Sequence, residues 1–136
     1  MLINDSLFDK LTEEAKKSPR LRMNFNLHDS LEAKAQRLFN ALEPGTVMPI
    51  HRHRHSSETQ MLMRGRMKVM FYDNNGRLFE EHILDNNIGN HGVQIPAGVW
   101  HSLEVLESGT VILEIKDGPY TPLQDEDILK IGLTQV

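Results

Sequence analysis

The chain has 136 residues, of which 39% are apolar and 25% charged, a composition typical of one soluble globular domain. Seven histidines stand against no cysteine, which excludes disulfides, thiolate metal sites and a cysteine nucleophile together. A net charge of −4 without a clustered basic face argues against nucleic acid as a partner, and no apolar run approaches the roughly 20 residues that span a bilayer. The first residues, MLINDSLFDK, lack the pattern of a signal peptide, so a cytoplasmic location is expected.

Residues 1–19 predict an N-terminal helical extension. Asn4–Asp5–Ser6 offers side chains that cap a helix, and Leu7, Leu11 and Ala15 share one helical face. Ser18–Pro19 ends the helix, because the residue before a proline is disfavoured in helical geometry.

Residues 20–28 alternate strictly between apolar and polar side chains, which is typical of a half-buried strand. Leu21, Met23, Phe25 and Leu27 fall on one side; Arg20, Arg22, Asn24, Asn26 and His28 fall on the other. After them, Asp29–Ser30 predicts the cap of a brief helical stretch, and residues 37–43 predict a second strand.

From residue 45 to residue 116, short apolar runs are separated by turn residues, as in an all-β barrel. The hairpin signal is clearest at Asn74–Asn75–Gly76, and Ser108–Gly109 predicts a later turn. Met61, Met63, Met67 and Met70 are expected to fill the barrel core. The predicted organisation is a helix over 1–19, a barrel over 20–123 and a tail over 124–136.

The segment from Gly45 to Gly65 contains two histidines with strand spacing. Residues i and i+2 of a strand point to the same side, so His51 and His53 can direct imidazoles at one ion. Glu58 follows after a short loop and can return a carboxylate to the same point. His55 offers an alternative pair with His53, but as a residue of a solvated loop it is the weaker candidate.

A second segment, Pro96–Ala–Gly98–Val–Trp–His101, predicts a turn that directs His101 from a later strand. Three imidazoles and one carboxylate suit a single divalent transition metal such as zinc, iron, manganese, nickel or copper, whereas calcium and magnesium prefer oxygen ligands. The metal ligands predicted here are therefore His51, His53, Glu58 and His101.

These two segments resemble the paired motifs of the cupin superfamily, G-x5-H-x-H-x4-E-x6-G followed by P-x-G-x-x-H. The matching residues are Gly45, His51, His53, Glu58, Gly65, Pro96, Gly98 and His101. Two positions depart from the pattern: Val105 stands where asparagine is usual, and Asn90 where a glycine is usual. The resemblance implies a single cupin barrel, a double-stranded β-helix or jelly roll, with the metal bound inside and reached from one end.

Within the superfamily the chain resembles the WbuC-type cupin-fold metalloproteins, which are associated with cell-surface polysaccharide genes. The stretches that carry this likeness are residues 20–28, Gln36–Arg37–Leu38 with Pro44–Gly45–Thr46, and residues 116–122. It implies a small-molecule ligand and a role in polysaccharide metabolism, and cupin barrels commonly form homodimers.

Two classes of function remain open. One is a metal-dependent enzyme, an isomerase, epimerase or oxygenase acting on a sugar or small polar metabolite; the other is a non-catalytic module that binds or senses such a molecule. An enzyme needs a proton-transfer group that is not a metal ligand, and the candidates are His28 and Tyr120. The guanidinium and amide groups of Arg20, Arg22, Asn24 and Asn26 suit substrate recognition if they face the cavity, and are an ordinary solvent face if they do not.

Overall fold

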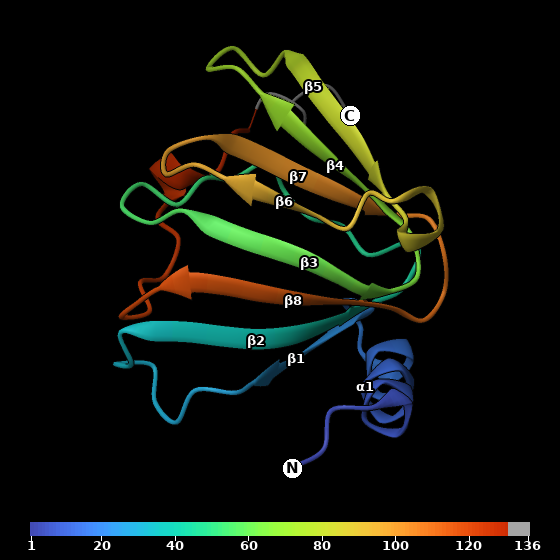
Figure 1. The fold of residues 1–136 in the computed structure, drawn as a ribbon. Coiled ribbons are helices and arrows are strands. Elements are labelled where there is room, and N and C mark those ends of the chain that lie inside the picture. The colour runs from blue at the N-terminus through green and yellow to red at the C-terminus, as the bar shows by residue number, and fades with distance from the viewer. Residues whose placement is uncertain (131–136) are drawn as a thin grey trace.

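The computed structural model describes residues 1–130, which form a jelly roll of two antiparallel sheets with one N-terminal helix (Figure 1). The strand order is β1-β2-β8-β3-β6 in the larger sheet and β5-β4-β7 in the smaller one. The elements are α1 (Asp5–Lys17), β1 (Arg22–Asn26), β2 (Ala35–Leu42), β3 (Glu58–Arg64), β4 (Met67–Tyr72), β5 (Leu78–Leu84), η1 (Asn86–Ile88), β6 (Gly92–Ile95), β7 (Trp100–Val105), β8 (Thr110–Asp117) and η2 (Asp125–Asp127). The predicted all-β fold with a short N-terminal helix is confirmed.

Helix α1 covers the outer face of the larger sheet rather than the barrel interior (Figure 1). The Asn4 side chain accepts a hydrogen bond from the Leu7 amide, and Ser18 ends the helix, as expected. The buried contact joins Phe8, Leu11 and Ala15 of α1 to Phe39, Ala41 and Val111 of the sheet. The predicted strand alternation is confirmed here too, since Met23, Phe25 and Leu27 pack against the same cluster.

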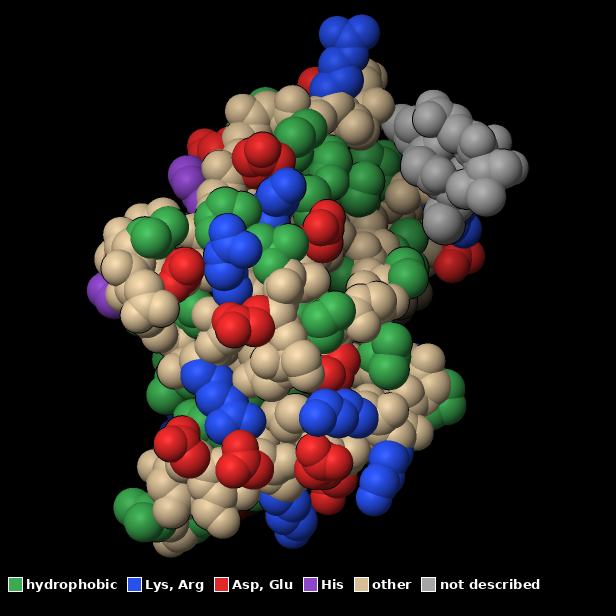
Figure 2. Space-filling view, turned by 90° about the vertical axis from the view of Figure 1, so that its right-hand side faces the viewer, with side chains coloured by type: hydrophobic (Ala, Val, Ile, Leu, Met, Phe, Trp, Pro, Cys, Tyr) green, Lys and Arg blue, Asp and Glu red, His purple; other side chains and the backbone are tan. Residues whose placement is uncertain are grey.

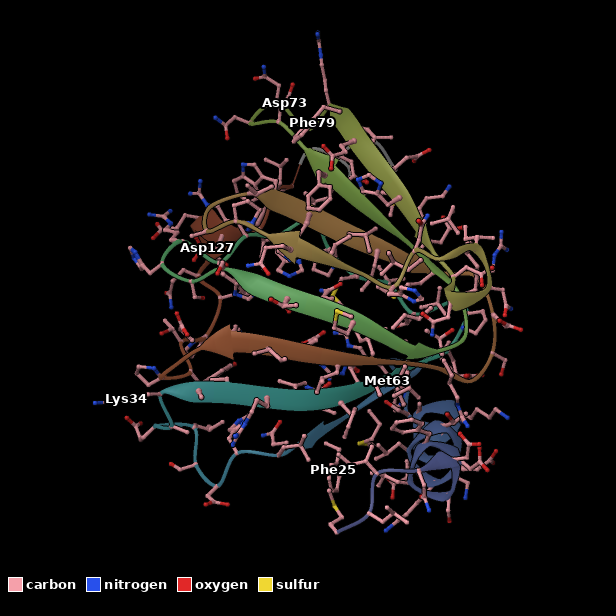
Figure 3. All side chains as sticks on the ribbon, viewed as in Figure 1. Phe25, Lys34, Met63, Asp73, Phe79 and Asp127 are labelled. Atoms are coloured by element: carbon pink, nitrogen blue, oxygen red, sulfur yellow. The ribbon has the colours of Figure 1, made fainter. Side chains whose placement is uncertain are left out.

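The barrel interior changes from polar to apolar along the strands. On β3 the inward residues are Glu58, Gln60 and Leu62, and all three are buried. Leu62 belongs to a dry core between the sheets, together with Leu42, Met67, Val69, Phe71, Leu84, Ile95, Leu103, Val105 and Ile112. The polar half lies at the opposite end of the barrel from α1, the end at which Figure 3 shows Lys34, just before β2, and Asp127 of η2. One end of the barrel therefore stabilises the fold while the other is free for a site.

Gly65 shows why a glycine is required at the end of the first motif. Its φ of +92° lies in the left-handed region, and a Cβ atom there would lie 2.5 Å from the Cα of Thr110. The turn between β3 and β4 therefore depends on close approach to the start of β8.

Two expectations about side chains and local structure were wrong. Met67 does fill the core, but Met61 and Met63 are each 37% exposed on the outer face of β3, and Met70 on β4 is only partly buried. Inward positions alternate along a strand, so Leu62 and Val69 occupy the interior instead. No helix follows Asp29; residues 28–34 form turns. Their carbonyl groups instead accept hydrogen bonds from Gln36 and from the segment after β8.

The chain after β8 returns to the predicted ligand segment. The amide of Leu129 donates to the carbonyl of Ile50, and the amide of Arg52 donates to that of Asp127. The Asp127 carboxylate also pairs with Arg54 at 2.7 Å. The predicted boundaries of the barrel at residues 19 and 123 stay a prediction. The tail forms backbone hydrogen bonds on both sides of His51 and so holds this extended segment in place.

The remaining surface carries charges of both signs. Figure 2 shows acidic and basic side chains interspersed over the face that includes α1. None of the helices in residues 1–130 is long and apolar enough to cross a membrane.

Candidate metal centre

His51 and His101 are brought together by backbone pairing. Each donates its amide to the carbonyl of the other, at 3.0 Å and 2.8 Å, and the imidazole centroids lie 4.3 Å apart. The segment around His51 is extended but forms only isolated bridges, so the predicted strand at His51–His53 is shorter than expected. Pairing with β7 nevertheless produces the geometry that the spacing predicts.

The imidazoles of His51, His53 and His101 converge on one point. Their candidate ligand nitrogens all lie within 4.8 Å of one another, a separation that one metal ion can bridge. His51 and His101 are buried and His53 is partly buried. The three histidines predicted from sequence are therefore the three that the structure brings together.

Backbone contacts orient two of the rings. Nδ1 of His51 lies 2.8 Å from the carbonyl oxygen of Pro49, and Nδ1 of His101 lies 2.9 Å from that of Val99. A carbonyl only accepts, so this network assigns the proton to Nδ1 in both rings. Nε2 then presents a free lone pair, which is the arrangement that metal-binding histidines usually have.

Glu58, the first residue of β3, lies beside the imidazoles. Its Oε2 is 3.6 Å from Nε2 of His53 and 3.5 Å from Nε2 of His101. Among the described residues, Glu58 Oε2 and His101 Nε2 are buried and have no hydrogen-bond partner. A buried carboxylate without a partner is costly, and a cation at this point removes the cost. The donor set of three nitrogens and one oxygen therefore fits a divalent transition metal.

The protonation states also fit a cation. Burial lowers the pKa of His51 and of His53 to about 4, with neighbouring positive charges adding to the effect, so both rings are neutral at pH 7. Burial raises the pKa of Glu58, but interaction with His101, His53 and Lys116 outweighs it and lowers the value to about 2. His51 and His53, being neutral, therefore contribute no positive charge beside Glu58. A bound metal would supply the missing positive charge.

A cavity of about 270 Å³ opens from these residues into the barrel. Of the polar row predicted on residues 20–28, Arg20, Arg22 and Asn24 line this cavity. Tyr120 also lines it, whereas Asn26 and His28 line an adjacent chamber. Of the two proton-transfer candidates, only Tyr120 thus borders the cavity of the metal residues.

Sequence reasoning missed five polar residues in the cavity wall: Asn40, Gln60, Ser102, Glu114 and Lys116. Burial is the main cause that raises the pKa of Glu114 to about 8, and the charge of Glu58 adds to it, while Asn40 and Lys116 oppose it. Glu114 therefore carries a proton near neutral pH. The sequence does show that Glu114 and Lys116 alternate with Leu113 and Ile115 in β8. Which of these two sets faces the cavity depends on which strands pair with β8.

The remaining histidines of the described chain, apart from His28, lie outside the site, as expected. His55 is exposed, His82 pairs with Glu80 at 2.7 Å on the surface, and His91 contacts Asn86. None of them belongs to the group of converging imidazoles.

Comparison with known proteins gives a family. Residues 3–84, more than half of the chain, match the model of a family described as "Domain of unknown function (DUF6016)". The chain belongs to this family. No curated protein matches the sequence.

Solved structures share this fold with the chain. The capsular polysaccharide assembling protein CapF from Staphylococcus aureus matches with a TM-score of 0.62 and 20% identity, over 73% of this chain and 27% of that chain. KdgF from Halomonas sp. matches with a TM-score of 0.59 and 13% identity, over 76% of this chain and 84% of that one. Oxalate decarboxylase from Bacillus subtilis, which has Mn(II) centres, matches with a TM-score of 0.54 and 22% identity, over 74% and 30%. The chain thus spans little more than a quarter of CapF.

Proposed function

We propose that this chain is a metal-dependent cupin whose ligand is a sugar or sugar acid. His51, His53, Glu58 and His101 hold one divalent transition metal ion in this proposal, with zinc, iron, manganese and nickel all suited to the donors. The observation that carries it is the convergence of three imidazoles and an unpartnered buried carboxylate on one cavity.

The cavity wall supports a ligand that is both acidic and hydroxylated. Arg22 donates from Nη1 to the carbonyl of Val47 at 2.9 Å, which holds its guanidinium at the wall, and Arg20 and Lys116 add positive charge. A guanidinium pairs well with a carboxylate. Asn40 Oδ1 and Gln60 Oε1 are buried acceptors without partners among the described residues, and they suit hydroxyl donors.

The chemistry favours an isomerase or epimerase. A metal bound by the four ligands supplies Lewis acidity toward a carbonyl or hydroxyl oxygen. Glu114 holds a proton near Glu58 and is not one of the proposed metal ligands, so it can give this proton to the ligand and, once deprotonated, take one back from it. Tyr120 at the mouth positions the ligand in this scheme. An oxygenase would need iron and dioxygen but no such proton-transfer group.

The second candidate is a non-catalytic module that binds or senses the same ligand. The observation that favours it is the hydrogen bond that the Asn40 side chain donates to the Glu114 carboxyl group at 3.5 Å. This bond holds the carboxyl group in the cavity wall, where it can contact a ligand without transferring a proton. The narrower kinship with WbuC-type proteins, and a role in cell-surface polysaccharide metabolism, belong to this proposal as well. They are supported by the likeness of the fold to CapF, a capsular polysaccharide assembling protein.

Calorimetry tests ligand binding directly. Metal-loaded protein is expected to bind glucuronate more tightly than glucose, and metal-free protein to bind neither. Arg22→Gln should weaken glucuronate binding at least tenfold, whereas Arg77→Gln, at an exposed arginine of the β4–β5 hairpin, should not. Equal affinity for glucuronate with and without metal contradicts the proposal.

Deuterium exchange separates the two candidates. An isomerase in D₂O incorporates deuterium at the carbon next to the carbonyl of glucuronate, which mass spectrometry detects, and Glu114→Gln should abolish this incorporation. Binding without any incorporation supports the non-catalytic module.

A further inference from the structure

A second chamber lies beside the metal cavity and shares part of its wall. Its volume is about 340 Å³, and Asn24, Glu114, Lys116 and Tyr120 border both spaces. The further wall of the chamber consists of Asn26, His28, Leu31, Gln36 and Leu38. Each space is near the lower limit of about 300 Å³ for a ligand pocket, so together they have room for a longer molecule than either holds alone.

Strand register makes the two spaces one surface. Asn26 pairs with Leu38, Leu38 with Glu114, and Glu114 with Gln60, so one row of inward residues crosses four strands. A neighbouring row runs from Gln36 through Lys116 to Glu58. A ligand group in the chamber therefore lies along the same sheet face as the metal ligand Glu58.

The chamber is preformed, because backbone contacts fix its rim. Gln36 donates from Nε2 to the carbonyls of Leu31 and Ala33, at 3.2 Å and 2.9 Å. The Tyr120 amide donates to the Leu31 carbonyl at 2.7 Å, and the Gly118 amide donates to the Lys34 carbonyl at 2.8 Å. A Cβ atom at Gly118 would collide with the Ala33 carbonyl oxygen, so this approach requires glycine. Binding there would cost little ordering of the loop.

His28 leaves an unpaired ring nitrogen at the chamber. Nδ1 of His28 lies 3.0 Å from the amide nitrogen and 2.9 Å from the carbonyl oxygen of Arg37, so the Arg37 backbone occupies this nitrogen in either tautomer. Only 7% of His28 is exposed, and its Nε2 has no hydrogen-bond partner among the described residues. Because buried polar groups are nearly always paired, this nitrogen indicates a hydrogen-bonding partner that the described residues do not supply.

The chamber differs in charge from the metal cavity. It contains neither Arg20 nor Arg22, and the polar groups that it does not share with the metal cavity are the side chains of Asn26, His28 and Gln36. Tyr120 is 46% exposed and offers a ring face, with Nζ of Lys116 5.9 Å from its centroid. Amides, an imidazole nitrogen and an aromatic face suit a neutral hydroxylated ring rather than a second acid.

From these observations we infer that the site takes a ligand of two units. The acidic, hydroxylated unit lies at the metal between Arg22 and Glu114, and a neutral sugar ring lies in the chamber between His28 and Tyr120. This inference rests on the proposed function and adds the size and charge pattern of its ligand.

The experiment compares glucuronate with disaccharides of glucuronate and glucose in the 1→3, 1→4 and 1→6 linkages. Titration calorimetry of the metal-loaded chain should show at least one disaccharide binding tenfold or more tightly than glucuronate. Asn26→Tyr places a bulky side chain in the chamber, so the ratio of the two affinities should fall to about one while the metal content is retained. The matched control, Lys34→Tyr, adds the same side chain at an exposed loop position outside both spaces and should keep the wild-type ratio.

Failure of this inference can be distinguished from failure of the proposed function. Glucuronate binding without a gain for any disaccharide, or a gain that survives in Asn26→Tyr, overturns the two-unit ligand alone. Absence of binding by all four sugars to metal-loaded protein overturns both.

Discussion

Replacing Glu58 with glutamine tests whether this carboxylate holds the metal. Its Oε2 is buried, lacks a hydrogen-bond partner among the described residues, and lies 3.5 Å from Nε2 of His101. Glutamine keeps the size of the side chain and removes the charge. Loss of a group that only supports a metal ligand costs about 10–100-fold in affinity, so loss of the ligand charge should cost about 100-fold or more.

The loss of metal affinity can be measured by thermal unfolding, as a smaller metal-induced rise in the melting temperature Tm. A metal at 100 times its Kd stabilises the folded state by about 2.7 kcal/mol, whereas a metal at its Kd contributes about 0.4 kcal/mol. For a domain of this size, 1 kcal/mol corresponds to about 3–5 °C in Tm. The metal-induced rise in Tm should therefore be about 8–13 °C for the wild type and about 1–2 °C for Glu58→Gln at the same metal concentration.

The matched control is Glu80→Gln. Glu80 also lies beside a histidine, with its carboxylate 2.7 Å from Nε2 of His82, but on the exposed face of β5. The control should keep the full rise in Tm. An undiminished rise in Glu58→Gln, or an equal loss in both variants, refutes the assignment of Glu58 as a ligand.

Three further predictions concern stability and pH. Gly65→Ala should lower the free energy of unfolding by at least ~2 kcal/mol in urea denaturation, because the new Cβ meets Thr110 at a positive φ; an unchanged midpoint contradicts this. In metal-free protein, Glu114 has a folded-state pKa raised to about 8, so its stabilising effect is complete below pH 4.5 and is lost as the pH rises through 8. Relative to Glu114→Gln, the wild type should lose roughly 2–4 kcal/mol of stability between pH 5 and pH 9, and parallel pH profiles would exclude a buried protonated carboxyl. Because burial lowers the pKa of His51 and of His53 to about 4, protons should begin to compete with the metal only near that pH. A metal affinity that weakens tenfold between pH 7 and pH 6 would contradict the burial of these rings.

The ligand histidines could be predicted from sequence because local features position them. His51 and His53 follow the two-residue period of an extended chain, and the turn at Gly98 directs His101. The jelly roll followed from the same alternation and from turns such as that at Gly76, whose φ is +80°.

The rest of the cavity could not be predicted, because it depends on strand pairing. Asn40, Gln60 and Glu114 meet only after β2, β8 and β3 become neighbours, although they are far apart in the chain. The same limit explains the error at Met61 and Met63, where the choice of inward face needed the partner strand. The homodimer that the resemblance implies stays a prediction.

Metal stoichiometry tests the central claim most directly. Elemental mass spectrometry of purified, reconstituted chain should find close to one transition metal ion per chain. The double variant His51→Ala/His101→Ala should carry almost none while keeping a β-rich circular dichroism spectrum. The control His82→Ala/His91→Ala removes two exposed histidines and should bind like the wild type. Absence of metal from both native and reconstituted protein, or its retention in the His51/His101 variant, would contradict a metal centre at this site.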